Sequence, residues 1–321
     1  MGDDARTNPD QAAVVAGQDF AEKVKDIRIP PLPAAAARLI AEINRTDPDM
    51  ERLVQVISSS PETAAKVIQT INSSIFSLRN PVISVRHAAA LLGLRHLRPI
   101  ALSFAMVGAV PRPPEDVFHH EAFWSDSLIR AMFSRSFATR ACPGDKEVAF
   151  TASLLADLAL PVLLLVRPRS YAPVVKRWNG SGHRLSQIER QIYGWDHAQA
   201  GAYILGTWGL PRELTRLVEL HTQDPEELEQ RQLADGVVLP ISVAALAPSV
   251  LQNDEQRGQG FVRAAMRYFG MTPREMVDQV GLIRSGFEEV CSVFEIRHRV
   301  ATAMLDQLVV AASLEDEVGG E

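Results

Sequence analysis

Apolar residues recur every three to four positions over nearly the whole chain, and alternation with a period of two is almost absent. The first spacing places apolar side chains along one face of an α-helix, whereas a half-buried strand needs the second. Ser60, Ser84 and Asp196 each precede such a stripe and can cap its helix. The sequence therefore predicts an all-α protein.

Several details of these helices can be predicted from single residues. Gly93 fits a left-handed helix stop. The segment 149–166 is apolar nearly all round, which indicates a central buried helix, and Pro161 is expected to break or kink it. Ser186 with Glu189 three residues later has the spacing of a capping box.

A proline-rich segment gives the clearest boundary, because three of the four residues from 111 to 114 are prolines and cannot continue a helix. A chain of 321 residues is long enough for two modules. We therefore predict two packed helical subdomains with polar ends. The predicted parts are a disordered polar N-terminus (1–20), an N-terminal helical subdomain (21–110), a proline-rich linker (111–118), a second helical subdomain (119–312) and an acidic tail (313–321).

Composition excludes several classes of protein. The net charge of −6 argues against a protein that mainly holds nucleic acid. Two cysteines exclude a disulfide scaffold and fit a reducing cytoplasm. No uninterrupted apolar run approaches the ~20 residues of a membrane span, so we expect a cytoplasmic protein that does not enter membranes. No phosphate-binding glycine motif is present, and we predict no cofactor.

One short region is locally basic despite the overall acidity. A phosphate or an acidic partner could bind this face, a solvated surface would give the same pattern, and helix–glycine–helix spacing also permits DNA binding. The candidate residues are Arg79, Arg86, His87, Arg95, His96 and Arg98.

Eight ordered segments resemble the HDOD domain of bacterial signalling proteins, over roughly Val24 to Gly286. They are Ile29-Pro30-Pro31-Leu32-Pro33, Ile57-Ser58-Ser59-Ser60-Pro61, Ile71-Asn72-Ser73-Ser74-Ile75-Phe76, Pro81-Val82-Ile83-Ser84, Ala90-Leu91-Leu92-Gly93-Leu94-Arg95-His96-Leu97, Phe123-Trp124, Asp196-His197-Ala198-Gln199-Ala200-Gly201 and Trp208-Gly209-Leu210-Pro211. This resemblance implies that the second subdomain is a degenerate bundle of the HD superfamily.

HD proteins are metal-dependent phosphohydrolases, in which a histidine, a His-Asp pair and a later aspartate hold a divalent metal that activates water. By resemblance, these positions fall here at Asp126, at Ala156-Asp157 and near Ala245. Alanine cannot bind a metal, and Asp126 offers oxygen in place of a histidine. The resemblance therefore implies a site that has lost most of its ligands.

Two further histidines match positions that supply extra metal ligands in the HD-GYP relatives. They are His197 and His221, and Thr222 stands where a second histidine follows in those relatives. Asp126, Asp157, His197 and His221 are thus the residual ligand-type residues. The alternative is that Asp157 is a buried carboxylate bonded to a neighbouring helix or to the His197 imidazole, and that both histidines are structural.

The resemblance implies a non-catalytic regulatory protein that acts by binding. Its expected partner is a signalling protein, a cyclic nucleotide-type ligand, or both. A ligand between two lobes would shift the population of their arrangements, while a closed former pocket would bind nothing. The alternatives are a divergent HD-type phosphohydrolase using Mn²⁺ or Fe, and a nucleic-acid-binding regulator that uses Arg86, Arg95 and Arg98.

Overall fold

The computed structural model describes residues 24, 28–47, 49–74, 76, 78, 80–179, 181–250, 255–296 and 301–318. Within these residues every regular element is a helix and no strand occurs. The all-α prediction is therefore confirmed. The N-terminus at 1–20, predicted to be disordered, lies outside the described residues.

Within the described residues, four helices precede the proline-rich segment. They are α2 (Ala34–Ile43), α3 (Met50–Ser58), α4 (Pro61–Asn72) and α5 (Val85–Val107). The hydroxyls of Ser60 and Ser84 each accept a hydrogen bond from the backbone N–H three residues on. Both predicted caps are therefore confirmed, because capping depends only on neighbouring residues.

Gly93 interrupts α5 with a kink. Its φ of 72° is positive, as a left-handed stop requires, but its ψ of 171° lies outside the left-handed helical region. This combination is essentially restricted to glycine. The glycine therefore redirects the helix instead of ending it, and α5 continues to Val107.

We expect Gly93→Ala to lower the free energy of unfolding by about 1–3 kcal/mol. A Cβ at this position would meet no atom within 4 Å, so the cost comes from the backbone conformation alone. The matched control is Gly206→Ala in a helix, where the Cβ also meets nothing and a gain of up to ~1 kcal/mol is expected. Urea denaturation measures both. Equal effects of the two substitutions would contradict the prediction.

The chain runs without a helix from 111 to 119 and then forms the C-terminal half. Its elements are α6 (His120–Ala141), η1 (Pro143–Asp145), α7 (Lys146–Leu155), α8 (Ala159–Val166), α9 (Pro168–Asn179), α10 (Leu185–Tyr193), α11 (His197–Thr207), α12 (Arg212–Leu220), α13 (Pro225–Gln230), α14 (Val238–Ala244), α15 (Glu255–Phe269), α16 (Pro273–Val293) and α17 (Ala301–Val318). Helix α17 continues five residues beyond 313, where the acidic tail was predicted to begin.

The apolar segment 149–166 is buried as predicted up to Leu164, but its break does not lie at Pro161. The helix stops after Leu155, turns through residues 156–158 and restarts as α8. Pro161 is the third residue of α8, where a missing N–H removes no intrahelical hydrogen bond. The break therefore lies at Asp157, and this places its carboxylate in a turn.

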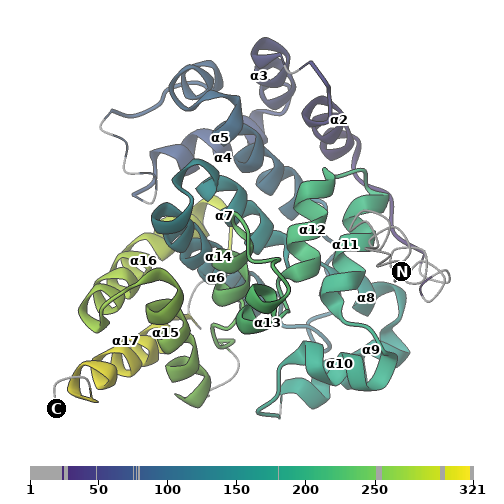
Figure 1. The fold of residues 1–321 in the computed structure, drawn as a ribbon. Helices are drawn as coiled ribbons and strands as arrows, with labels where there is room; N and C mark the ends of the chain where they lie inside the picture. The colour runs from purple at the N-terminus through teal and green to yellow at the C-terminus, as the bar shows by residue number, and fades with distance from the viewer. Residues whose placement is uncertain are drawn as a thin grey trace, which may run out of the picture.

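Helices α6, α7 and α14 form the centre of the molecule (Figure 1). Helices α2 to α5 lie on one side of this centre, α8 to α12 on a second and α15 to α17 on a third. Among the described residues, buried apolar side chains from both sides of the proline-rich segment join one hydrophobic cluster.

Two hydrogen bonds fasten the start of the described chain to its C-terminal half. The Trp208 Nε1 donates to the Pro30 carbonyl over 2.8 Å. The Asn44 Nδ2 donates to the Gly209 carbonyl over 2.6 Å. Two of the segments that carried the family resemblance, at 29–33 and 208–211, are therefore in contact.

Within the described residues, two helical stretches are long and apolar enough to cross a membrane by length and composition. They are Val85–Val107 and Pro143–Val166, whose most apolar windows are 39% and 89% buried inside the protein. The kink at Gly93 interrupts the first, and the turn at 156–158 interrupts the second. Core helices of folded domains pass the same test.

Candidate functional site

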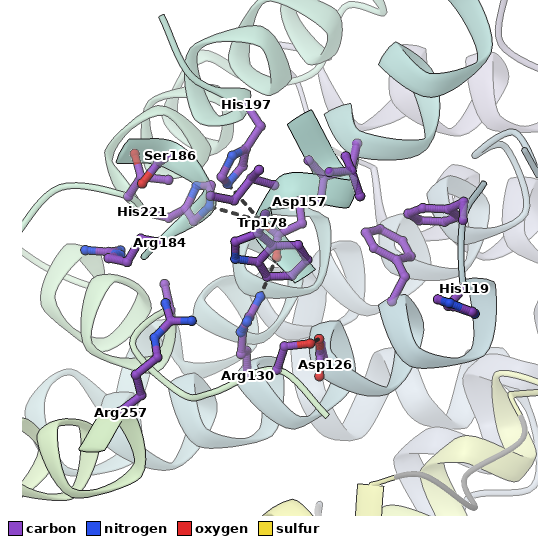
Figure 2. Close-up of a pocket in the computed structure, with 18 of the residues that line it drawn as sticks. His119, Asp126, Arg130, Asp157, Trp178, Arg184, Ser186, His197, His221 and Arg257 are labelled. Atoms are coloured by element: carbon purple, nitrogen blue, oxygen red, sulfur yellow. Dashed lines mark hydrogen bonds and ion pairs between the residues drawn. The ribbon is translucent and has the colours of Figure 1, made fainter. Parts of the chain in front are cut away.

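A cavity of about 80 Å³ lies within the C-terminal half (Figure 2), and residues 117–119, which directly precede α6, form part of its wall. This volume is several times what one water molecule needs. All four residual ligand-type residues line it: Asp126, Asp157, His197 and His221. All of its lining residues lie at or after residue 117. This cavity therefore does not lie between the two predicted lobes, where a ligand was expected.

Asp157 is the centre of the site. Its side chain is buried in the turn between α7 and α8. The Oδ1 atom lies 3.1 Å from Nε2 of His197 and 3.3 Å from Nε2 of His221. The Oδ2 atom accepts a hydrogen bond of 2.6 Å from Nη1 of Arg130. Burial opposes ionisation, but these three partners outweigh it and hold the pKa of Asp157 well below its usual range.

His197 is positioned by groups on both sides of its ring. It is the first residue of α11, and Asp196 caps that helix as predicted. The carboxylate of Glu189 accepts from its backbone N–H over 2.9 Å and lies 2.5 Å from its Nδ1. Burial alone would lower the pKa of His197, but Glu189 and Asp157 outweigh it and raise this pKa to about 10. His197 is therefore an imidazolium at neutral pH.

Glu189 connects this histidine to a second buried ring. The Tyr171 hydroxyl donates to Oε1 of Glu189. The predicted capping box is therefore wrong, because α10 begins at Leu185 and Ser186 is already inside its first turn. Glu189 turns into the core instead, where burial and the adjacent carboxylate hold the pKa of Tyr171 well above its usual range.

His221 reaches the same carboxylate from the end of α12. Its Nδ1 lies 2.6 Å from the Val218 carbonyl, to which it donates. This bond turns the other ring nitrogen, Nε2, toward Asp157. This geometry agrees with the prediction that Asp157, His197 and His221 lie together. It also agrees with the alternative, in which Asp157 is a buried carboxylate bonded to the His197 imidazole.

Asp126 lines the cavity but faces away from this cluster. Its carboxylate accepts from the Ser249 hydroxyl over 2.5 Å and from the Val250 N–H over 2.7 Å. Burial outweighs Arg130 and these hydrogen bonds, and raises the pKa of Asp126 to about 6. The carboxylate therefore fixes the segment after α14 to α6, and its ligand atoms do not join those of Asp157.

We tested whether these residues fit the metal of HD proteins. Ligand atoms of Asp157, His197 and His221 all lie within 4.8 Å of one another, which is close enough for one ion. However, Ala156 and Ala245 provide no ligand, and Arg130 places a fixed positive charge on the second oxygen of Asp157. The described residues therefore do not fit the HD metal centre.

Three arginines in the cavity were not predicted as site residues. Arg130, Arg184 and Arg257 come from α6, from the residue before α10 and from α15. Figure 2 shows Arg184 and Arg257 on one side of the pocket and His119 on the opposite side. Of these three arginines, only Arg130 could have been linked to the site from the sequence. It follows Asp126 by four residues and therefore lies on the same face of the predicted helix.

The predicted basic face is not brought into this cavity, and two of its arginines are ion-paired. Arg86 pairs with Glu51 on α3, and Arg95 pairs with Asp145 in η1. Of the other four, His87 is exposed, His96 and Arg98 are half-buried, and Arg79 lies outside the described residues. The two ion pairs neutralise charges that the nucleic-acid alternative would need.

The described residues define an all-helical protein in which Asp157, His197 and His221 form one buried cluster. Residues 29–224, more than half of the chain, match the HDOD domain. The chain therefore belongs to the HDOD family. No curated protein matches its sequence.

Three solved structures share this fold. An HDOD domain protein with unknown function from Geobacter sulfurreducens has a TM-score of 0.61 at 20% identity, over 89% of this chain and 99% of its own. A protein from Shewanella amazonensis SB2B, provisionally assigned as a phosphohydrolase, has a TM-score of 0.59 at 19% identity, over 90% and 98%. A protein from Marinobacter aquaeolei VT8, provisionally assigned to signal transduction, has a TM-score of 0.55 at 23% identity, over 92% and 66%.

Proposed function

We propose that this chain is a non-catalytic bacterial signal-transduction protein that binds a small ligand in the cavity and reports its presence to a protein partner in the cytoplasm. One observation carries the proposal. Arg130 forms an ion pair of 2.6 Å with the aspartate that would otherwise be the main metal ligand. Asp157 is buried and Arg130 is half-buried, so solvent screens this pair less than it screens an exposed one.

The composition of the cavity wall supports a sensing role. It joins the segment 117–119 to the beginning of α10, the end of α12 and the beginning of α15. A ligand that contacts several of these elements favours the arrangement in which all contacts are made. A change in the position of residues 117–119 would also move the proline-rich segment. This segment connects directly to the N-terminal helices and would pass the change to their surface.

The likeness to solved structures agrees with this proposal at the level of fold. One of these proteins is provisionally assigned to signal transduction. Another is provisionally assigned as a phosphohydrolase, so the fold alone does not choose between regulation and catalysis. The ion pair of Asp157 with Arg130 and the alanines at 156 and 245 support regulation.

We expect the purified protein to contain well under one metal ion per chain and to hydrolyse no phosphate ester when Mn²⁺ or Fe²⁺ is added. Three of the four HD ligand positions have lost their usual residue, and the remaining carboxylate is paired with Arg130. Elemental analysis measures the first quantity, and release of phosphate or nucleotide from mono- and diesters measures the second.

A metal-dependent hydrolase is the second candidate, and one observation favours it. The Nδ1 atoms of both histidines are held by acceptors, Glu189 and Val218, while both Nε2 atoms face Asp157. Metal-binding histidines are commonly held in this way. Stoichiometric metal together with hydrolysis that Asp157→Asn abolishes would establish this candidate and overturn the regulatory one.

A further inference from the structure

One stretch of this acidic chain is strongly basic. Residues 158–188 contain five arginine and lysine residues and no aspartate or glutamate, whereas the whole chain has a net charge of −6. Helix α9 lies in this stretch, and the neighbouring α10 contains a single acidic residue, Glu189. Glu189 is buried and is already bonded to Tyr171 and His197. The positive charge of this stretch is therefore not matched by acidic residues of its own helices.

Four of the five cations lie at the surface, on α9 or directly before it. Arg169, Lys176 and Arg177 are exposed, and Arg167 is half-buried. Within the described residues, no hydrogen bond or ion pair joins their charged groups to another residue. Several exposed arginines elsewhere, on α5, α6, α15 and α16, do pair with acidic side chains. The surface of α9 therefore carries positive charge that the fold leaves unmatched.

These cations lie on one outer surface. Lys176 and Arg177 follow Arg169 by seven and eight residues, so all three lie on the same side of the helix. The Tyr193 hydroxyl at the end of α10 donates a hydrogen bond of 2.8 Å to the Ser170 carbonyl. The beginning of α9 therefore lies beside the end of α10.

Two exposed apolar side chains border the cations. Leu165 at the end of α8 is 47% exposed, and Ile192 at the end of α10 is 46% exposed. Leu165 precedes Arg167 by two residues, and Ile192 directly precedes Tyr193. We call this surface the α9 face; it consists of Leu165, Arg167, Arg169, Lys176, Arg177 and Ile192.

Stability of the helix explains only part of this arrangement. Lys176 and Arg177 lie in the last turn of α9, where a positive charge interacts favourably with the helix dipole. Arg169 lies in the first turn, where the dipole favours a negative charge, and this turn contains no acidic residue. Arg169 is therefore unfavourable for α9 alone, and a carboxylate bound from outside would compensate its charge.

The inner side of the same helix lines the cavity. Val175 and Trp178 come from α9, and Arg184 and Leu185 come from the beginning of α10 (Figure 2). A ligand that changes the position of α9 would therefore also move the α9 face. This gives the cavity a second connection to the surface, through a single helix.

We propose that the α9 face is the docking surface for an acidic segment of the protein partner. Carboxylates of the segment would pair with the four cations, and its apolar side chains would contact Leu165 and Ile192. This inference rests on the proposed function, because it names the surface that the partner binds and the chemistry of the partner. Complementary charge of this kind speeds the encounter and selects the partner.

A protein segment fits the α9 face better than a membrane or a nucleic acid does. Apart from the cations, the residues of α9 described as exposed are Pro168, Ser170 and Pro173, which provide no large apolar side chain to enter a lipid interface. A long nucleic acid would extend beyond the four cations and meet the acidic remainder of the chain. A short acidic segment avoids this repulsion.

The test compares two double variants by fluorescence anisotropy at low salt. The probe is a labelled synthetic peptide with the repeat Glu-Glu-Leu, and a peptide with the repeat Gln-Gln-Leu is its uncharged counterpart. The α9 variant combines Arg169→Glu with Lys176→Glu. The control combines Arg274→Glu with Arg231→Glu, which changes the net charge by the same amount.

The control residues are matched to those of the α9 face. Arg274 and Arg231 are exposed, lie outside the α9 face and have no ion pair among the described residues. Arg274 is the second residue of α16 and follows a proline, as Arg169 does in α9. Glutamate in the first turn is favourable in both helices.

Wild type and the control variant should bind the acidic peptide more tightly than the uncharged one, and added salt should weaken this binding. The α9 variant should bind the acidic peptide roughly 10-fold more weakly, since two ion pairs are lost and two repulsions are added. Arg169→Gln with Lys176→Gln should give an intermediate affinity. Thermal unfolding of each variant checks that it is folded, and the glutamine variant decides if the α9 variant is not.

Equal affinity of the α9 and control variants for the acidic peptide would overturn the proposal. So would the absence of peptide binding to wild type at low salt. Binding of phosphatidylserine vesicles or duplex DNA that depends on Arg169 and Lys176, without binding of the peptide, would assign the α9 face to a membrane or a nucleic acid and would also overturn it.

Failure of this inference can be distinguished from failure of the proposed function. Equal peptide affinity of both double variants, in a protein without metal or hydrolysis, would remove the docking surface and leave the regulatory function in place. Metal-dependent hydrolysis that Asp157→Asn abolishes would remove the regulatory function, even if the peptide binds the α9 face.

Discussion

Replacement of Arg130 by methionine is expected to lower the free energy of unfolding by about 3–5 kcal/mol at pH 7. Methionine keeps much of the side-chain volume but removes the positive charge, so the buried Asp157 carboxylate loses its 2.6 Å partner. The Ala247 carbonyl loses a hydrogen bond as well. Urea denaturation followed by circular dichroism measures the change.

The control for Arg130→Met is Arg267→Met, which removes an exposed ion pair with Glu226. An exposed pair contributes about 0–1 kcal/mol, so this variant should remain close to wild type. Adding Asp157→Asn to Arg130→Met should recover part of the loss, since the unpaired charge is then removed. Equal effects of the two methionine variants would show that Arg130 does not stabilise Asp157.

Glu189→Gln is expected to destabilise the protein at pH 7 by about 3 kcal/mol and to flatten its stability between pH 7 and 10. The Glu189 carboxylate accepts from Tyr171 and from two N–H groups of His197, and glutamine cannot accept at both ends. Its loss also removes a charge that raises the pKa of His197.

The direction of this pH dependence follows from the raised pKa of His197. A group whose pKa is higher in the folded state contributes its full stability below its unfolded pKa of about 6.5. That contribution is lost as the pH rises toward 10, with a slope of up to about 1.4 kcal/mol per pH unit. Asp157 has the opposite behaviour, and its contribution is lost as the pH falls below about 3.9.

The readout for Glu189→Gln is the difference from wild type at each pH, since other groups also titrate in this range. Glu115→Gln is the control, because Glu115 is exposed and has no ion pair among the described residues. If Glu189→Gln kept the wild-type slope between pH 7 and 10, the raised pKa of His197 would need another cause.

Features of the fold that depend on neighbouring residues could be predicted from the sequence. The caps at Ser60, Ser84 and Asp196 require only a side-chain oxygen and a backbone N–H in the next turn. Ser186 has the same local pattern and was predicted wrongly. In the folded protein Glu189 bonds to His197 instead, and a buried charged partner outweighs a local cap.

The candidate site also contains residues that could be predicted from the sequence and residues that could not. The resemblance to a known family predicted four residual ligand-type residues, namely Asp126, Asp157, His197 and His221. The ligand atoms of the last three converge, and those of Asp126 do not join them. The resemblance did not predict Arg130 or Arg184, because no periodicity relates them to Asp157. Arg130 reaches Asp157 across 27 residues of chain and from a different helix. Such contacts depend on tertiary packing, which no local pattern encodes.

The hydrogen bond between Trp208 and Pro30 joins residues 178 positions apart. During synthesis, the segment that begins with Pro30 therefore leaves the ribosome long before its partner exists. At typical rates of elongation this interval is on the order of 10–35 s. For that time Pro30 and Asn44 lack the contacts that Trp208 and Gly209 finally provide. We therefore expect chaperone binding during translation to fall once residues 208–211 have left the ribosome.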